Sequence, residues 1–189
     1  MMRFSRWLPI LMAVLMVPAC GMRKQAAEKA LTDVELAYAQ IVDQARNVAP
    51  DEAQAIEAGI AAAKGELAKG NADAVLAAAK DLDAKVKTLA ESLPDLQTKL
   101  QADWKDLTNS VPGALAMLRK KLDDLGRPPA GMPGREVFDA TTAQLAPLGE
   151  KWDEATSLFV SGKLAQAVSM GGEVKGEVVK LITGLQTGS

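Results

Sequence analysis

Apolar residues recur at intervals of three and four along the first half of the chain, which places them on one face of a helix. Three such stripes cover 27–48, 53–67 and 75–93. They consist of Ala27, Leu31, Val34, Tyr38, Ile41, Ala45 and Val48, then Ala53, Ile56, Ile60, Ala63 and Leu67, then Val75, Ala79, Leu82, Val86, Leu89 and Leu93. The spacing predicts three amphipathic helices. Because successive segments repeat the pattern and can cover one another, a bundle is favoured over a coiled coil with another chain.

Turn signals separate these stripes. Ala49-Pro50-Asp51-Glu52 ends one helix and begins another, because proline suits the first helical position and carboxylates are favourable at the positive end of the helix dipole. Lys69-Gly70-Asn71 is a helix stop followed by an N-cap residue. So short a connection predicts an antiparallel hairpin, whose second helix should end at Pro94.

The second half of the chain predicts shorter helices. Ser110 to Gly113 should interrupt the helical pattern, and the three prolines and three glycines of 126–134 indicate a loop. Pro147 should kink or break a helix near Ala146, since an internal proline costs ~3 kcal/mol or more. The stripe residues are Leu96, Leu100, Trp104, Leu107, Leu115, Leu118, Leu122, Leu125, Phe138, Thr141, Leu145, Leu148, Trp152, Ala155, Phe159, Leu164, Val168, Val174, Val178, Leu181 and Leu185.

Three glycines weaken the last stripe. Gly171, Gly172 and Gly176 each cost up to ~1 kcal/mol relative to alanine in a helix interior. Either this helix frays, or the glycines let a neighbouring backbone come close. Together the patterns predict an all-α, up-and-down bundle of about six or seven helices. We expect one domain, 20–189, with the 126–134 loop between two sub-units.

Two segments of the chain match at a fixed offset. Residues 63–93 and 155–185 pair Ala63 with Ala155, Gly70 with Gly162, Leu82 with Val174, Val86 with Val178, Leu89 with Leu181 and Leu93 with Leu185. Two related helical hairpins would explain the match, and so would chance between alanine-rich amphipathic sequences. The hairpin at 152–185 is similar to a tetratricopeptide turn through Ala155, Leu158, Gly162, Ala167 and Val168, although the closing proline of that repeat is missing.

The N-terminus has the three parts of a secretory signal. Arg3 and Arg6 supply positive charge, 8–17 is an apolar run, and Ala19 is a small residue at the cleavage edge. The apolar run is too short to cross a bilayer, which takes about 20 residues. Residues 1–19 are therefore predicted to be a cleaved signal peptide.

Val17-Pro18-Ala19-Cys20 resembles the lipobox of bacterial lipoproteins, although Pro18 is an unusual occupant. The resemblance implies that Cys20 receives a diacylglycerol on its thiol and a further acyl chain, such as palmitate, on its amine. Gly21 favours the periplasmic face of the outer membrane, since an aspartate there would indicate inner-membrane retention. The alternative is an ordinary secreted protein with a free or disulfide-bonded cysteine, although the chain holds no second cysteine.

The stretch from Cys20 to Leu93 resembles small helical lipoproteins of unassigned function from Gram-negative envelopes. The resemblance depends on two alanine-rich helices joined by Ala49-Pro50-Asp51-Glu52 and on the Gly-Asn turn after the second. It implies an envelope-associated helical bundle and brings no catalytic residue with it.

Composition excludes several classes of function. Loss of Arg3 and Arg6 with the signal would leave 20 basic against 24 acidic residues, a net charge near −4, so nucleic acid is not an expected partner. The chain has no histidine, which removes histidine triads and the usual zinc and haem ligation. Because Cys20 would be acylated, thiol catalysis is not expected either. We therefore predict no enzyme, no metal and no cofactor.

Carboxylates and aromatic residues are the remaining candidates for chemistry. Glu91-Ser92 resembles the Glu-Ser pair of lytic transglycosylases, but the glycine-methionine-glutamine motif of that family is missing, and an exposed helix end is the favoured interpretation. Neighbouring residues in a helix point about 100° apart, so two adjacent acidic pairs are not ready acid/base dyads. The two acidic pairs are Asp123-Asp124 and Asp153-Glu154. The basic run Arg119-Lys120-Lys121 is expected to be solvated, and the aromatic residues Trp104, Trp152 and Phe159 are expected in the core.

The sequence therefore predicts a lipid-anchored structural or adaptor module for envelope proteins. Its partners would be membrane lipid, through acylated Cys20, and an envelope protein. The alternatives are a cell-wall enzyme that uses carboxylates and a carrier of an apolar ligand between helices. The sequence leaves the oligomeric state open. Few residues separate Cys20 from the first stripe at Ala27, so we expect Arg23, Lys24 and Lys29 to lie near lipid head groups.

Overall fold

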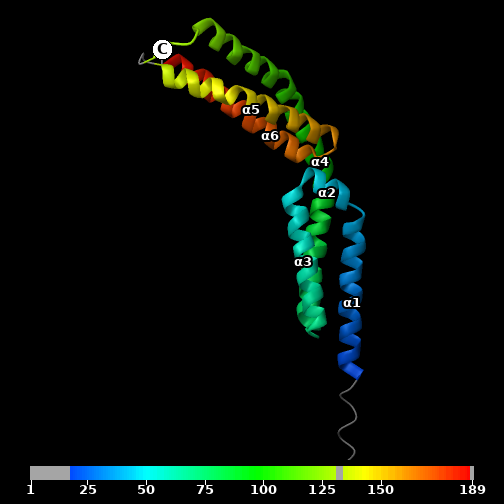
Figure 1. Cartoon of the computed structure of the whole chain (residues 1–189). Coiled ribbons are helices and arrows are strands. Elements are labelled where there is room, and N and C mark those ends of the chain that lie inside the picture. The colour runs from blue at the N-terminus through cyan, green and yellow to red at the C-terminus, as the bar shows by residue number, and fades with distance from the viewer. Residues whose placement is uncertain (1–17, 131–133, 188–189) are drawn as a thin grey trace, which may run out of the picture. The chain divides into compact units, whose positions relative to one another are not determined.

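The structure is a computed structural model that describes residues 18–130 and 134–187. Within these ranges the chain forms six helices and no strand (Figure 1). The helices are α1 (Pro18–Ala39), α2 (Val42–Val48), α3 (Pro50–Ala68), α4 (Ala72–Leu125), α5 (Arg135–Val160) and α6 (Leu164–Thr187). The predicted all-α helical bundle is confirmed.

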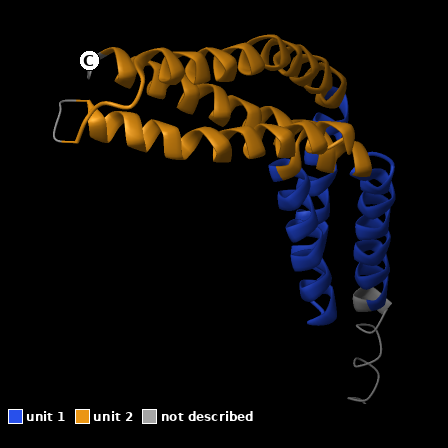
Figure 2. Cartoon of the chain, turned by 45° about the horizontal axis from the view of Figure 1, so that its top comes forward, with its two compact units in different colours: residues 1–42, 51–91 blue, residues 43–50, 92–189 orange. Residues whose placement is uncertain are grey.

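The chain divides into two compact units, coloured separately in Figure 2. Unit 1 consists of residues 1–42 and 51–91, and unit 2 of residues 43–50 and 92–189. The division falls within α4, whereas the 126–134 loop that was expected between two sub-units lies inside unit 2. The reason is that the last turns of α4 share a core with α5 and α6, to which Leu118 and Leu122 contribute.

Unit 1 is built from α1, α3 and the first part of α4. The hydroxyl of Tyr38 on α1 donates to Glu57 at 2.9 Å and contacts the carbonyl of Ala53 at 3.3 Å, while Glu35 lies 2.6 Å from Lys64 Nζ. From Glu35 to Tyr38 the residue number rises along α1, while the contacted residue on α3 falls from 64 to 57. The two helices therefore run antiparallel. The predicted stripe of α4 is buried at every position from Val75 to Leu93.

The first predicted helix divides in two. The stripe of 27–48 indicated one continuous helix, but a turn at Gln40 and Ile41 separates α1 from α2, and both amides bond to carbonyls three residues earlier. Nothing in the local sequence breaks a helix here. The turn lets Ala45 and Val48 become buried within unit 2, so packing overrides local helix propensity.

Prolines do not end the helices, contrary to the predictions for Pro94 and for Ser110 to Gly113, and of the kink or break expected near Ala146 the break does not occur. α4 continues through Pro94 and Pro112, and α5 continues through Pro147. All three prolines are exposed, so each lies on the solvent-facing side of its helix. The neighbouring stripe residues remain buried, for example Leu93 and Val111. Packing of the buried face therefore offsets the cost of the proline on the exposed face.

The turns α3–α4 and α5–α6 have the same backbone structure. Gly70 and Gly162 both have positive φ, 82° and 81°. In each turn the glycine amide bonds to the carbonyl three residues earlier, at 3.0 Å, and the next amide bonds to the carbonyl five residues before it. This is the Schellman arrangement, in which glycine avoids the cost of left-handed backbone. The equal turns explain why Gly70 matches Gly162 between 63–93 and 155–185.

A stack of aromatic rings forms part of the core of unit 2. Trp104 on α4 stacks with Trp152 at 5.3 Å between ring centroids and with Phe159 at 4.8 Å. Trp152 and Phe159 lie two turns apart on α5, about 10 Å along its axis, so the Trp104 ring inserts between them. The predicted core position of Trp104 is confirmed. Phe159 is 37% exposed and Leu125 is 50% exposed, because each lies in the last turn of its helix.

Gly171 is the glycine of α6 that permits close contact. A Cβ there would lie 3.1 Å from Leu107 Cδ1 and 3.3 Å from Trp152 Cζ3, whereas Gly172 and Gly176 face open space. α6 extends to Thr187, so the fraying alternative does not hold for its described length. At Gly171 the close neighbours are therefore side chains and not the backbone that was expected, and at Gly172 and Gly176 nothing lies close.

The adjacent residues Gly171 and Gly172 allow a matched test. Gly172→Ala should stabilise the fold by up to ~1 kcal/mol, because alanine favours the helix and meets no neighbour. Gly171→Ala should be about 1–3 kcal/mol less stable than Gly172→Ala, because the stacked tryptophan rings cannot move away from the added methyl group. Chemical denaturation of both variants measures the difference, and equal midpoints would contradict the packing described here.

Candidate functional site

The predicted lipid-attachment region lies at the start of α1. Residues 1–17 and the side chain of Cys20 are outside the described residues, so the predicted signal peptide and the acylation of Cys20 remain predictions. The backbone of 18–20 already belongs to α1, and Ala27 is the first fully buried residue. Cys20 therefore lies on the helix itself, without an intervening linker.

Each basic residue near this cysteine has a carboxylate partner. Arg23 contacts both oxygens of Asp73 at 3.1 Å, and Lys29 lies 2.6 Å from Asp33. Lys24 lies 3.8 Å from Glu28. The expected position of these cations near lipid head groups stays a prediction, and within unit 1 each of them has a carboxylate partner. The Arg23 pair also brings the first turn of α4 beside the start of α1.

The α3–α4 turn holds a second balanced group. Asn71 donates its side-chain amide to Glu66, and Lys69 Nζ lies 2.7 Å from the same carboxylate. These hydrogen bonds, from Asn71 first and Lys69 second, lower the pKa of Glu66 below its usual value. Its carboxylate forms an ion pair with Lys69 within the turn.

The carboxylates considered for catalysis are all exposed on the surfaces of their helices. Glu91 is exposed on α4, although it lies within the helix rather than at the predicted helix end. Asp123-Asp124 and Asp153-Glu154 are also exposed, on α4 and α5. Among the described residues, no three His, Cys, Asp or Glu side chains form a group that could hold a metal ion.

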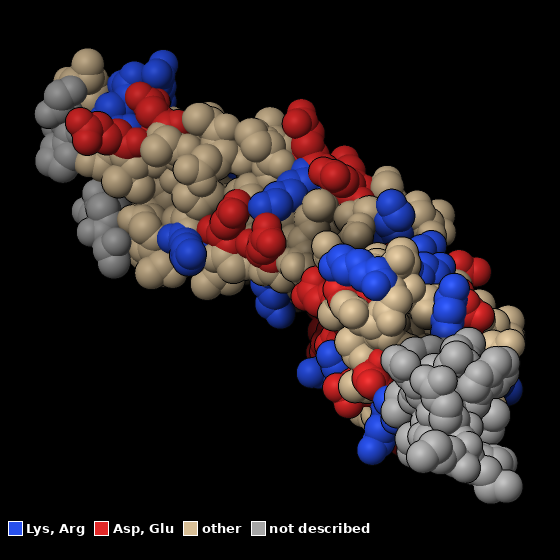
Figure 3. Space-filling model, turned by 90° about the horizontal axis from the view of Figure 1, so that it is seen from below, with Lys and Arg blue, Asp and Glu red and all other residues tan. Residues whose placement is uncertain are grey.

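The remaining candidates are surface and core features. Arg119 and Lys120 are exposed and Lys121 is half-buried, near the C-terminal end of α4, as predicted for a solvated basic run. Basic and acidic side chains are interspersed on the face shown in Figure 3. In the aromatic stack, Trp152 and Phe159 cover the two faces of the Trp104 ring. That arrangement fills the space that a ligand ring would need.

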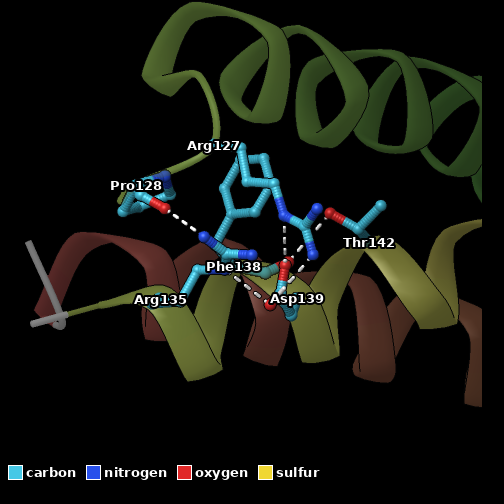
Figure 4. A network of polar contacts seen from close by, with 6 residues as sticks. All are labelled: Arg127, Pro128, Arg135, Phe138, Asp139 and Thr142. Carbon is cyan, nitrogen blue, oxygen red and sulfur yellow. Dashed lines mark hydrogen bonds and ion pairs between the residues drawn. The ribbon is translucent and has the colours of Figure 1, made fainter. Parts of the chain in front are cut away.

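An arginine–aspartate network secures the connection between α4 and α5 (Figure 4). Arg127, from the loop after α4, donates Nε to Asp139 at 3.1 Å, and Arg135 donates Nε to the same carboxylate at 2.7 Å. Arg135 also donates to the carbonyl of Pro128. The hydrogen bond from Arg135, followed by that from Arg127, holds the pKa of Asp139 below its usual value.

This network was not predicted from the sequence. Arg135 and Asp139 are four residues apart on one helix, a spacing that by itself signals an ion pair. Arg127 is twelve residues from Asp139 and no local pattern indicates that contact. A similar link joins α5 to α6, where Lys151 lies 2.8 Å from Glu173 and 3.7 Å from Glu177. The hydrogen bond to Glu173 is the main cause of the raised pKa of Lys151.

Comparisons with protein-family models, with curated proteins and with solved structures found no match. None of the helices in the described part of the chain is long and apolar enough to span a membrane.

The Asp139 network predicts a pH-dependent contribution to stability. Since the pKa of Asp139 is lower in the folded protein than in the unfolded chain, its contribution is present above the ordinary aspartate pKa of about 3.9 and is lost as the pH falls below that value. Asp139→Asn should therefore be less stable than wild type at pH 7, and the difference should shrink toward pH 3. Denaturant midpoints across this range measure it. The control Asp153→Asn removes an exposed carboxylate of the same helix and should change little; a constant difference for Asp139→Asn would contradict the network's role.

Proposed function

We propose that the chain is a lipid-anchored helical module on the periplasmic face of the outer membrane, where it acts as a structural or adaptor module for envelope proteins. The observation that carries the proposal is the position of Cys20. The residues before it resemble a signal peptide with a lipobox, and the cysteine lies in the first turn of α1. Removal of 1–19 would leave the acylated residue as the N-terminus of a packed helix.

The missing linker supports action close to the membrane. Lipoproteins that work far from their membrane need a flexible tether, and Gly/Ser-rich tethers reach about 5 to 6 Å times the square root of their length. Here α1 already includes Cys20, and residues 20–39 would extend about 30 Å from the anchor at 1.5 Å per residue. The envelope partner would therefore be a membrane-embedded or membrane-proximal protein.

Exposed apolar residues on α1 support contact with such a partner. Met22 is 69% exposed and Leu36 is 60% exposed. They are fourteen residues apart in the helix, which is about four turns, so they lie on nearly the same side of α1. A membrane-proximal protein could contact this side of α1 without disturbing the buried stripe from Ala27 to Tyr38.

The acyl anchor is tested by metabolic labelling with a fatty acid. Wild type should be labelled and should partition into the detergent phase, because two or more chains give stable anchoring. Cys20→Ser should be unlabelled and should keep its signal, since the modified thiol is absent.

The matched control is Gly21→Asp, which keeps the cysteine. It should still be labelled but should move to the inner membrane, because aspartate at this position indicates retention there in the proteins that the lipobox resembles. An unlabelled wild-type protein would refute the anchor. Labelled wild type with Gly21→Asp unchanged in location would refute the outer-membrane assignment alone.

A further inference from the structure

The geometry of unit 1 brings two separate segments to one end. The antiparallel contacts of α1 with α3 direct the α3–α4 turn back toward the start of α1, as Figure 1 shows. Arg23 contacts Asp73, which follows the turn by two residues and lies in the first turn of α4. Cys20 is three residues before Arg23, about 4.5 Å along the helix axis. The turn residues Lys69, Gly70 and Asn71 are exposed.

The charges at this end are balanced. Its cations Arg23, Lys24 and Lys69 lie 3.1, 3.8 and 2.7 Å from Asp73, Glu28 and Glu66 respectively. An unpaired basic residue near an anionic membrane gains about fivefold in affinity. A carboxylate within 4 Å would be repelled by the same surface, so the described residues of this end gain little from anionic lipid.

We propose that in the acylated protein the α3–α4 turn and the first turns of α1 together face the lipid head groups, and that this end fits a zwitterionic rather than an anionic lipid surface. The inference rests on the proposed acylation of Cys20. A zwitterionic head group carries one ammonium and one phosphate, and the exposed ion pairs of this end offer a partner for each. Membrane attachment then comes from the acyl chains, and the ion pairs set only how unit 1 meets the surface.

Proximity to the head groups can be measured with a fluorophore on an engineered cysteine of the full acylated protein, since acylated Cys20 does not react with the label. Ala68→Cys lies in the last turn of α3 beside the turn, and Ala58→Cys lies about 15 Å away along the same helix. Both positions are exposed, and at both of them cysteine replaces alanine. In zwitterionic vesicles that contain a lipid with a nitroxide on its head group, the probe at 68 should be quenched severalfold more than the probe at 58.

Lipid composition tests the charge balance. Replacing part of the zwitterionic lipid with phosphatidylglycerol should leave quenching at 68 unchanged. The double variant Asp73→Asn/Glu66→Gln removes two carboxylates and leaves Arg23 and Lys69 unpaired. Its probe should be quenched more strongly in anionic than in zwitterionic vesicles, and added salt should remove the difference because it screens exposed charges.

The outcomes separate this inference from the proposed function. Mass measurement of the purified protein reports acylation independently of quenching. Acylated protein with equal quenching at 68 and 58 overturns the orientation and leaves the anchor intact. Wild-type quenching that rises with anionic lipid overturns the charge balance. Protein without acyl chains overturns both the anchor and the inference.

Discussion

Close approach between helices is the constraint on which the rest of the structure depends, because the chain has few large side chains to fill the space between them. Aromatic residues make up 4% of the sequence, and Ala27, Ala45, Ala155 and Ala167 are completely buried. Alanine buries little area per contact, so long and uninterrupted stripes must supply the hydrophobic free energy. This need explains why α4 remains helical through Pro94 and Pro112, whose exposed positions leave the buried face unchanged.

Spacing alone predicted most of the buried face. Every α4 position from Val75 to Leu93 in the predicted stripe is buried, because a repeat of three and four residues constrains which side of a helix meets its neighbour. Helix ends were less predictable. The turn at Gln40 and Ile41 has no sequence signal. The break considered at Pro147 does not occur, because residues of α5 on either side of the proline are buried. Both differences have one cause: tertiary packing decides where a helix ends when local preferences are weak.

The polar features were harder to predict than the core. A spacing of four residues is typical of pairs within one helix, such as Lys29 with Asp33, although no such pair was predicted. No local pattern indicates the contact of Arg23 with Asp73, because it joins residues fifty positions apart. This contact gives the exposed guanidinium of Arg23 a carboxylate partner within unit 1. The prediction for Cys20 depends on its neighbours in sequence, and its side chain lies outside the described residues.

The central claim is that α1 begins at the membrane and meets its partner there. Photocrosslinking in intact cells tests it most directly, with the crosslinker at Leu36 on α1 and, for comparison, at Ala130 in the loop after α4; both positions are exposed. The account predicts that Leu36 gives products with membrane-embedded or membrane-proximal proteins and that Ala130 does not. Products from Ala130 alone, formed with soluble periplasmic proteins, would contradict it.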